Sequence, residues 1–211
     1  SFHGLAEHLE SGFIGLKFSI LCSLAVKKVL MVTINNLFSS INIRGVDFPN
    51  RIVVPPMCQY SAHEGYVDDW HLVNLGRFAM GGAGLIITEA TAVQKKGRIT
   101  HGCPGIWKDE QIIGHSRIAQ FVSRNGAIPG IQLGHAGRKA SMQRPWYGNG
   151  PLNEGDFERG DMPWKIVAPS ACPVGEGWQI PEELSEEQIC ELIDDFISAA
   201  RRSISAGYKV I

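Results

Sequence analysis

Side chains with reactive or hydrogen-bonding groups follow three apolar runs of the chain, each at the point where its run ends. They are Cys58 and Tyr60, then Glu89 and Thr91, and then Gln132 and His135. If the runs are parallel strands, their carboxyl ends meet at one edge of the sheet, where ligand sites are usually formed. A thiol, a phenol and an amide gathered there suit the binding of a small molecule, so the sequence predicts a site at these strand ends.

The first of these runs has the most informative ending. Arg51 to Val54 is rich in β-branched residues and is followed directly by Pro55 and Pro56. Because proline has no backbone N–H, the strand stops donating ladder hydrogen bonds at this point. The next residues are then free to present their side chains above the sheet.

Strands and helices alternate along the rest of the chain. A short hairpin around Gly45 is expected to lead into the first core strand. Further strands are predicted at 85–93, 127–133 and 208–211. Helices are predicted at 69–80, capped by Asp68 or Asp69, and at 109–125, capped by Asp109. A third helix is predicted to run from the Ser185/Gln188 capping box to Gly207. This order predicts an α/β fold with a parallel sheet. Residues 137–181 are too long for an ordinary connection and indicate a functional excursion.

Four strands are too few to close a barrel, so the sheet is either open or one part of a larger barrel. No GxGxxG follows a strand and no GxxxxGK[ST] occurs, which disfavours a classical dinucleotide fold. Gly81 to Gly84 precedes a strand and is better interpreted as a helix terminator than as a phosphate loop. Polar residues at successive strand ends instead favour the N-terminal part of a (β/α)8 TIM barrel, with about four of its eight strands.

Composition narrows the class of protein further. The chain has 211 residues, a net charge of −1 and 44% hydrophobic residues, which gives no electrostatic footprint for nucleic acid or an anionic membrane. Lysines interrupt the apolar run 12–31, so a transmembrane span is not expected there. The five cysteines lack metal or disulfide spacing and fit reduced thiols in the cytoplasm. Met31 is a plausible start, and residues 1–36 are interpreted as an extension of uncertain status.

Six ordered motifs then suggest a family. They are Asn50–Ser61, Asp69–His71, Gly84–Ala92, Gly105–Trp107, Gly130–Lys139 and Val167–Ser170. Together they resemble the old yellow enzyme family, the FMN-dependent, NAD(P)H-using ene-reductases, and specifically its bacterial-type subgroup with a cysteine after the first strand. The resemblance covers residues 37–211 and implies the N-terminal portion of an FMN-binding TIM barrel.

The resemblance assigns roles to individual residues. It implies that the flavin contacts Pro55, Pro56, Met57, Cys58, Ala90 and Gln132, and that Cys58 and Tyr60 take part in catalysis. Gln132 matches the glutamine that pairs with the pyrimidine edge of the flavin, because one amide offers a donor and an acceptor in one plane. Tyr60 matches a tyrosine that holds the substrate carbonyl oxygen or helps to deliver a proton. Cys58 matches a cysteine that tunes reduction of the ring.

Other residues keep plainer interpretations or open alternatives. His71 and His115 lie on helical patterns and are expected to be packing or surface residues. Arg138 fits either the edge of the flavin or an ion pair beneath the long loop. Pro55 departs from the family pattern, which usually has serine or alanine there and therefore an N–H.

The implied reaction transfers hydride from NAD(P)H through flavin N5 to an activated alkene such as an enone. The family's His-x-x-His or His-x-x-Asn pair and its phosphate-binding residues belong beyond Ile211, so little or no activity is expected of the 211 residues alone. The alternative is a non-catalytic half-barrel fragment. The expected partner is a small enone-type substrate, with neither nucleic acid nor membrane, and a homo-oligomer is left open.

Overall fold

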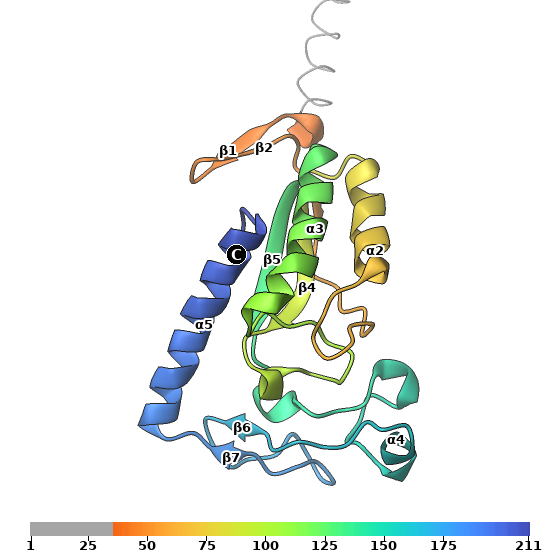
Figure 1. The fold of residues 1–211 in the computed structure, drawn as a ribbon, viewed down its shortest axis with the longest axis vertical. Coiled ribbons are helices and arrows are strands. Elements are labelled where there is room, and N and C mark those ends of the chain that lie inside the picture. The colour runs from red at the N-terminus through yellow and green to blue at the C-terminus, as the bar shows by residue number, and fades with distance from the viewer. Residues whose placement is uncertain (1–35) are drawn as a thin grey trace, which may run out of the picture.

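A computed structural model describes residues 36–211, and its centre is a parallel sheet of three strands (Figure 1). The strands are β3 (Val53–Val54), β4 (Leu85–Ala92) and β5 (Ile128–Gly134), and they pair in that order. β4 is buried along most of its length, as expected for a central strand of a parallel sheet covered on its faces. The predicted α/β order with a parallel sheet is confirmed.

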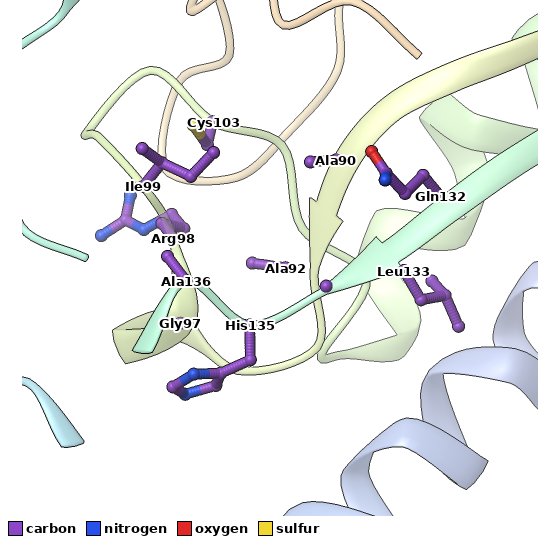
Figure 2. A pocket seen from close by; sticks show the side chains of 11 residues that line it. Ala90, Ala92, Gly97, Arg98, Ile99, Cys103, Gln132, Leu133, His135 and Ala136 are labelled. Carbon is purple, nitrogen blue, oxygen red and sulfur yellow. The ribbon is translucent and has the colours of Figure 1, made fainter. Parts of the chain in front are cut away.

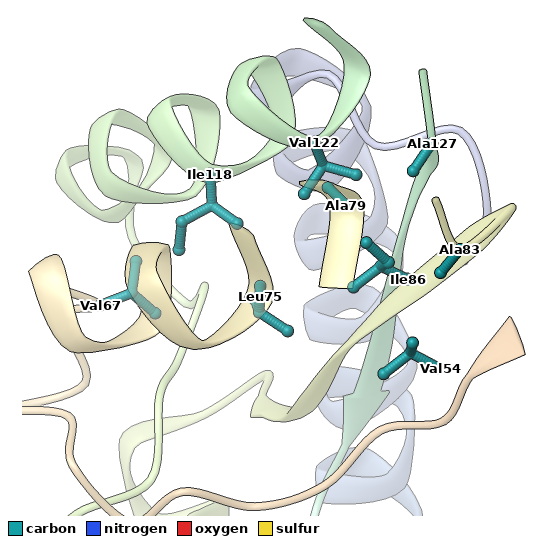
Figure 3. Packing of buried hydrophobic residues seen from close by; sticks show 9 residues of the cluster. All are labelled: Val54, Val67, Leu75, Ala79, Ala83, Ile86, Ile118, Val122 and Ala127. Carbon is teal, nitrogen blue, oxygen red and sulfur yellow. The ribbon is translucent and has the colours of Figure 1, made fainter. Parts of the chain in front are cut away.

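Three helices pack along the sheet: α2 (Asp69–Met80), α3 (Ile112–Arg124) and α5 (Glu186–Ala206). α3 lies between the other two and contacts both. One core cluster joins β3 and β4 to α2 and α3 (Figure 3); it consists of Val54, Val67, Leu75, Ala79, Ala83, Ile86, Ile118, Val122 and Ala127. A second cluster joins β5 to α3 and α5 through Ile131, Ala119 and Ala199. Burial of these apolar side chains fixes the sheet beneath the strand ends.

Local sequence signals set three of the helix ends correctly. Asp68 caps α2, because its carboxylate accepts the N–H of Trp70 at 3.0 Å. Ser185 and Gln188 form the predicted capping box of α5. Gly207 ends that helix with φ 103°, a left-handed conformation that glycine adopts without a Cβ clash.

The start of α3 was predicted wrongly. Asp109 does not cap this helix; it lies in a short 3-10 turn over Asp109–Gln111, and α3 begins at Ile112. The Asp109 carboxylate instead accepts a hydrogen bond from Nε of Arg202 on α5 at 2.6 Å. A contact between residues so far apart in sequence carries no local signal.

The predicted fourth strand, 208–211, is reduced to a single bridge. Val210 pairs in parallel with Gly130 of β5, and its carbonyl accepts the N–H of Ile131 at 2.9 Å. The chain therefore runs beside β5 in the expected direction, but the extended strand itself was predicted wrongly within the described residues.

A β-bulge interrupts the pairing of β4 with β5 close to the strand ends. Thr88 pairs with Ile131 and Thr91 pairs with Leu133, so Glu89 and Ala90 together oppose one residue of β5, Gln132. Such a bulge re-aims side chains and is common beside active sites.

The remaining elements lie at the two ends of the sheet (Figure 1). The predicted hairpin is formed by β1 (Ile41–Ile43) and β2 (Val46–Phe48) around a turn at Gly45, where φ is 85°. The excursion over residues 137–181 is largely irregular and contains α4 (Glu154–Glu158) and β6 (Val167–Ala168). β6 pairs with β7 (Glu182–Glu183) just before α5.

Within residues 36–211, no helix is both long enough and apolar enough to span a bilayer. The apolar run 12–31, the plausible start at Met31 and most of the extension 1–36 lie outside the described residues.

Candidate functional site

The bulge places two predicted ligand contacts in one cavity. Ala90 and Gln132 both line a cavity of about 150 Å³ at the carboxyl ends of β4 and β5 (Figure 2). Arg98, Cys103 and His135 complete its polar and sulfur lining. This cavity lies at the strand ends where the sequence predicts a ligand site, and the bulge explains why Ala90 faces Gln132.

The segment after β3 runs beside this cavity, although none of its residues lines it. Pro55 and Met57 are exposed, whereas Pro56, Cys58 and Tyr60 are half-buried, as alternation along an extended chain requires. The sulfur of Cys58 faces both the backbone N–H of Ala90 and the Tyr60 hydroxyl. Cys58, Tyr60, Ala90 and Gln132 thus lie in one neighbourhood, and Pro55 and Met57 form its outer side.

Burial keeps the two reactive groups of this segment protonated. Burial raises the pKa of the Cys58 thiol to about 11, with a further contribution from the negative charge of Glu89. Burial also raises the pKa of Tyr60 to about 12. Both groups are neutral donors at neutral pH, so Cys58 is not an activated nucleophile.

Tyr60 has an unusual backbone conformation for its residue type. Its φ is 53°, in the left-handed region that non-glycine residues rarely adopt. Its ring contacts Trp146 of the excursion edge to face, with 5.8 Å between the ring centroids. Its carbonyl lies so close to Gly102 that a Cβ at residue 102 would be 2.1 Å from the oxygen. The short segment Gln59–Ser61, called the Tyr60 turn below, is thus fixed from the excursion and from the loop after β4.

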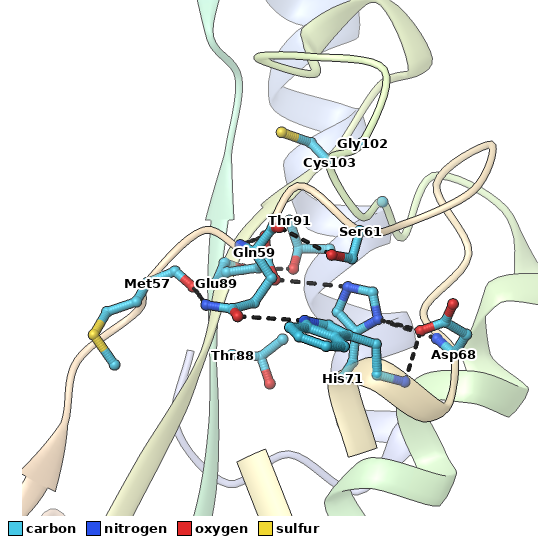
Figure 4. A network of polar contacts seen from close by, with 12 residues as sticks. Met57, Gln59, Ser61, Asp68, His71, Thr88, Glu89, Thr91, Gly102 and Cys103 are labelled. Atoms are coloured by element: carbon cyan, nitrogen blue, oxygen red, sulfur yellow. Dashed lines mark hydrogen bonds and ion pairs between the residues drawn. The ribbon is translucent and has the colours of Figure 1, made fainter. Parts of the chain in front are cut away.

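A buried carboxyl group lies beneath this turn (Figure 4). Glu89 is 3% exposed, and its Oε2 accepts the backbone N–H of Gln59 at 2.8 Å. Its Oε1 lies 3.7 Å from Nε2 of His71, and Nδ1 of His71 lies 2.9 Å from the Asp68 carboxylate. Burial raises the pKa of Glu89 from 4.5 to about 7, against the lowering effect of the N–H groups of Gln59 and Tyr60.

From the sequence, Glu89 was predicted to lie at a strand end, but it was assigned no role. Its signal was an acidic residue within an otherwise apolar strand, and such a residue is rarely buried without a partner. Arg98 was missed altogether: it is 3% exposed and its guanidinium lies over Trp107 and Trp164, 5.7 and 5.1 Å from the ring centroids. Trp164 belongs to the excursion, so no local pattern could reveal this contact.

The two histidines are packing residues, as predicted, and Arg138 does not form the ion pair that was one of its two alternatives; its place at the flavin edge stays a prediction. His71 and His115 are buried, at 1% and 0% exposure. Nη2 of Arg138 donates to the Ser170 hydroxyl at 3.0 Å, and within the described residues no carboxylate pairs with it. Among residues 36–211, no group of three His, Cys, Asp or Glu side chains could hold a metal ion.

The residues present fit a planar flavin ring. Gln132 is exposed at the cavity, and its amide makes no hydrogen bond to the described part of the chain, so its donor and acceptor are both available. Ala90 adds only a methyl group beside that amide, which leaves room for a ring edge. The neutral thiol of Cys58 adds no charge or bulk.

Comparison with known proteins identifies the family of the chain. Residues 36–211 match the model of the NADH:flavin oxidoreductase / NADH oxidase family. The chain is 47% identical over 175 residues to the NADH:flavin oxidoreductase FG08077 of Gibberella zeae, covering 82% of this chain and 42% of that protein. It is 41% identical over 177 residues to an NADPH dehydrogenase of Geobacillus sp., covering 83% and 46%. The chain spans less than half the length of these relatives.

Solved structures extend the likeness to the fold. Morphinone reductase matches with a TM-score of 0.67 and 26% identity, covering 82% of this chain and 46% of that one. An old yellow enzyme from Pichia sp. matches with a TM-score of 0.66 and 27% identity, covering 82% and 44%. The described residues therefore form part of a TIM barrel of the old yellow enzyme type, as the motif order predicted. From its motifs, its fold and these matches, the chain belongs to the NADH:flavin oxidoreductase / NADH oxidase family.

Proposed function

We propose that this chain forms one wall of the FMN site in an NAD(P)H-dependent oxidoreductase that reduces activated alkenes such as enones. When bound, FMN supplies the hydride chemistry between NAD(P)H and the alkene carbon. Pro55, Pro56, Met57, Cys58, Ala90 and Gln132 are the proposed flavin contacts. Family membership supports the cofactor, and the strand-end cavity supports where it is held.

One observation carries the proposal: Gln132 opposes Ala90 across the bulge, with the sulfur of Cys58 facing the Ala90 N–H. A free planar amide beside a small residue suits the donor and acceptor pattern of a pyrimidine edge. A neutral, polarizable sulfur next to them suits contact with a ring whose charge changes on reduction.

Tyr60 has the proposed role of a proton donor. Its pKa is raised to about 12 by burial, so the hydroxyl keeps its proton at neutral pH. It can then donate a hydrogen bond to a substrate carbonyl oxygen, or supply the proton that the reduced alkene takes up at its second carbon. Trp146 packs edge to face against the tyrosine ring.

Flavin titration of the 211-residue chain tests the proposal. FMN fluorescence is followed on addition of wild-type protein, Gln132→Leu and the matched control Gln120→Leu, whose glutamine is exposed on α3. Gln132→Leu is expected to weaken binding about tenfold or more, because a paired polar edge loses its partner. Equal binding by all three proteins would contradict the assigned flavin contact.

A second measurement separates the alternative of a non-catalytic half-barrel. NADPH oxidation by the flavin-loaded chain is recorded with and without an enone. Retained flavin with enone-dependent oxidation supports the oxidoreductase. Failure of the wild-type chain to retain FMN supports the half-barrel alternative. The association of two copies of the chain is not tested by this measurement and stays a prediction.

A further inference from the structure

The Tyr60 turn is held by a group that the proposed reaction does not use. A left-handed φ of 53° at a tyrosine is unfavourable by itself and persists only where its surroundings fix it. The nearest polar group beneath the turn is the Glu89 carboxyl, which accepts the N–H of Gln59 at 2.8 Å. The N–H of Tyr60 also faces this carboxyl.

We propose that Glu89 is a positioning residue, whose ionised carboxylate holds Cys58 and Tyr60 in place by accepting the backbone N–H groups of the turn between them. This inference rests on the proposed function, since it assigns Glu89 the task of orienting two residues of that site. Ionised acceptors make shorter and stronger hydrogen bonds than neutral ones. The turn is therefore held firmly when Glu89 is charged and loosely when it is protonated.

The surroundings of Glu89 make both states accessible. From α2, His71 faces it at 3.7 Å, and Asp68 lies behind that imidazole. From the turn, Cys58 and Tyr60 face it, and Cys103 faces the same region from the loop after β4. Within the described chain, no lysine or arginine pairs with this carboxylate.

His71 lies beside Glu89 but does not neutralise the charge of its carboxylate. Burial lowers the pKa of His71, so the imidazole is neutral at neutral pH. Its Nε2 is buried and has no hydrogen-bond partner among residues 36–211. Glu89 therefore relies on the backbone N–H groups of the turn for its stabilisation, and the turn relies on Glu89 in return.

Amide hydrogen exchange tests the inference without any flavin. The protection of the Gln59 and Tyr60 amides, corrected for intrinsic exchange, is measured in the wild-type chain at about pH 8.5 and about pH 5.5, on either side of the Glu89 titration. We expect about tenfold or more higher protection at the alkaline pH, because the charged acceptor holds the turn. Glu89→Gln is expected to abolish most of this difference.

The control is Glu64→Gln, which changes an exposed carboxylate of the same loop that pairs with Lys95 at 3.0 Å. It is expected to keep the wild-type pH dependence, and Glu89→Asp is expected to restore part of it. If Glu89→Gln does not fold, the wild-type profile decides alone: protection that does not change with pH contradicts the inference.

A separate readout distinguishes this inference from the proposed function. Alkylation of Cys58 is followed by peptide mass at constant pH, with exposed Cys172 in the same sample as reference. Glu89→Gln is expected to speed Cys58 alkylation several-fold, since the turn is looser and a neighbouring negative charge is gone. Flavin binding with an unchanged Cys58 rate would overturn the positioning role alone, whereas altered exchange without flavin binding would overturn only the proposed function.

Discussion

Two buried polar networks begin at adjacent residues of β4 and differ in charge and in completeness. Thr88 Oγ1 contacts the Tyr208 hydroxyl at 3.1 Å, and that hydroxyl contacts Nδ1 of His115 at 2.9 Å. Nε2 of His115 lies 3.2 Å from the Gly105 carbonyl. Glu89 begins the second network, which contains a titrating carboxyl and an imidazole nitrogen that has no hydrogen-bond partner in the described part of the chain.

In the first network every polar group has a partner of the correct kind. The Gly105 carbonyl can only accept, so Nε2 of His115 carries the proton and Nδ1 accepts from Tyr208. Burial lowers the pKa of His115 to about 4, which keeps the ring neutral. This network ties α3 to β4 and to the residues after α5, and it contains no group that changes charge near neutral pH.

The second network has the opposite character. It keeps a carboxyl in a site where ionisation is unfavourable, and it supports a strained tyrosine backbone. Buried ionisable groups of this kind are concentrated at functional sites because the perturbed pKa and the strain serve chemistry. The difference teaches that the completed network serves the fold, while the incomplete one serves the site.

Among the substitutions that test this comparison, Tyr208→Phe has the largest expected effect, a loss in the free energy of unfolding. The ring and its packing stay, but His115 and Thr88 each lose a buried partner. At about 1–3 kcal/mol for each group, the free energy of unfolding is expected to fall by roughly 4 kcal/mol. Urea denaturation measures this loss, with Tyr66→Phe at the surface as control. A loss no greater than that of the control would mean that the first network does not stabilise the fold.

In contrast to Tyr208→Phe, Glu89→Gln is expected to gain stability relative to wild type as the pH rises from acid to neutral. Because the folded-state pKa is raised above 4.5, the folded protein binds more protons than the unfolded one between pH 4.5 and about 7. The contribution of Glu89 to stability therefore falls as pH rises through this window, by about 3 kcal/mol in all. Relative to wild type, Glu89→Gln should become more stable from acid to neutral pH in urea unfolding. A difference that is constant with pH would show that Glu89 does not titrate there.

Ala90→Leu separates the needs of the site from those of the fold. Residue 90 is half-buried at the bulge and faces the cavity, so a larger side chain fills ligand space. FMN affinity is expected to fall about tenfold or more, while the free energy of unfolding changes by less than about 1 kcal/mol. Flavin titration and urea unfolding measure the two quantities. A large loss of stability with intact binding would reverse the assignment.

Tyr60→Phe gives the smallest expected effect. The Tyr60 hydroxyl lowers the pKa of the Cys58 thiol, so its removal should raise that pKa further above about 11. Cys58 alkylation in mildly alkaline solution is then expected to slow by less than about tenfold, since one hydrogen bond is lost. Cys172 in the same sample serves as reference. Faster alkylation would indicate that the ring shields the thiol more than the hydroxyl activates it.

Much of the fold follows from local sequence signals. The caps at Asp68 and Ser185 and the stop at Gly207 are set by short-range hydrogen bonds and backbone preferences, and all three were predicted. The prediction that Asp109 caps α3 was wrong because its actual partner, Arg202, is distant in sequence. The prediction of an extended fourth strand was wrong because residues 208–211 pair with β5 through one bridge only. The apolar pattern of these residues does not show how far such pairing extends.

The sequence by itself determined the order of elements, the family and the strand-end position of Cys58, Tyr60, Ala90 and Gln132, because periodicity, caps and motifs are local. Only the tertiary structure decided that a bulge sets Ala90 opposite Gln132, and that Glu89 lies beneath the Tyr60 turn. A bulge depends on the register of two strands, and a buried carboxyl depends on what packs around it. Both are long-range properties, and a single sequence carries no direct record of them.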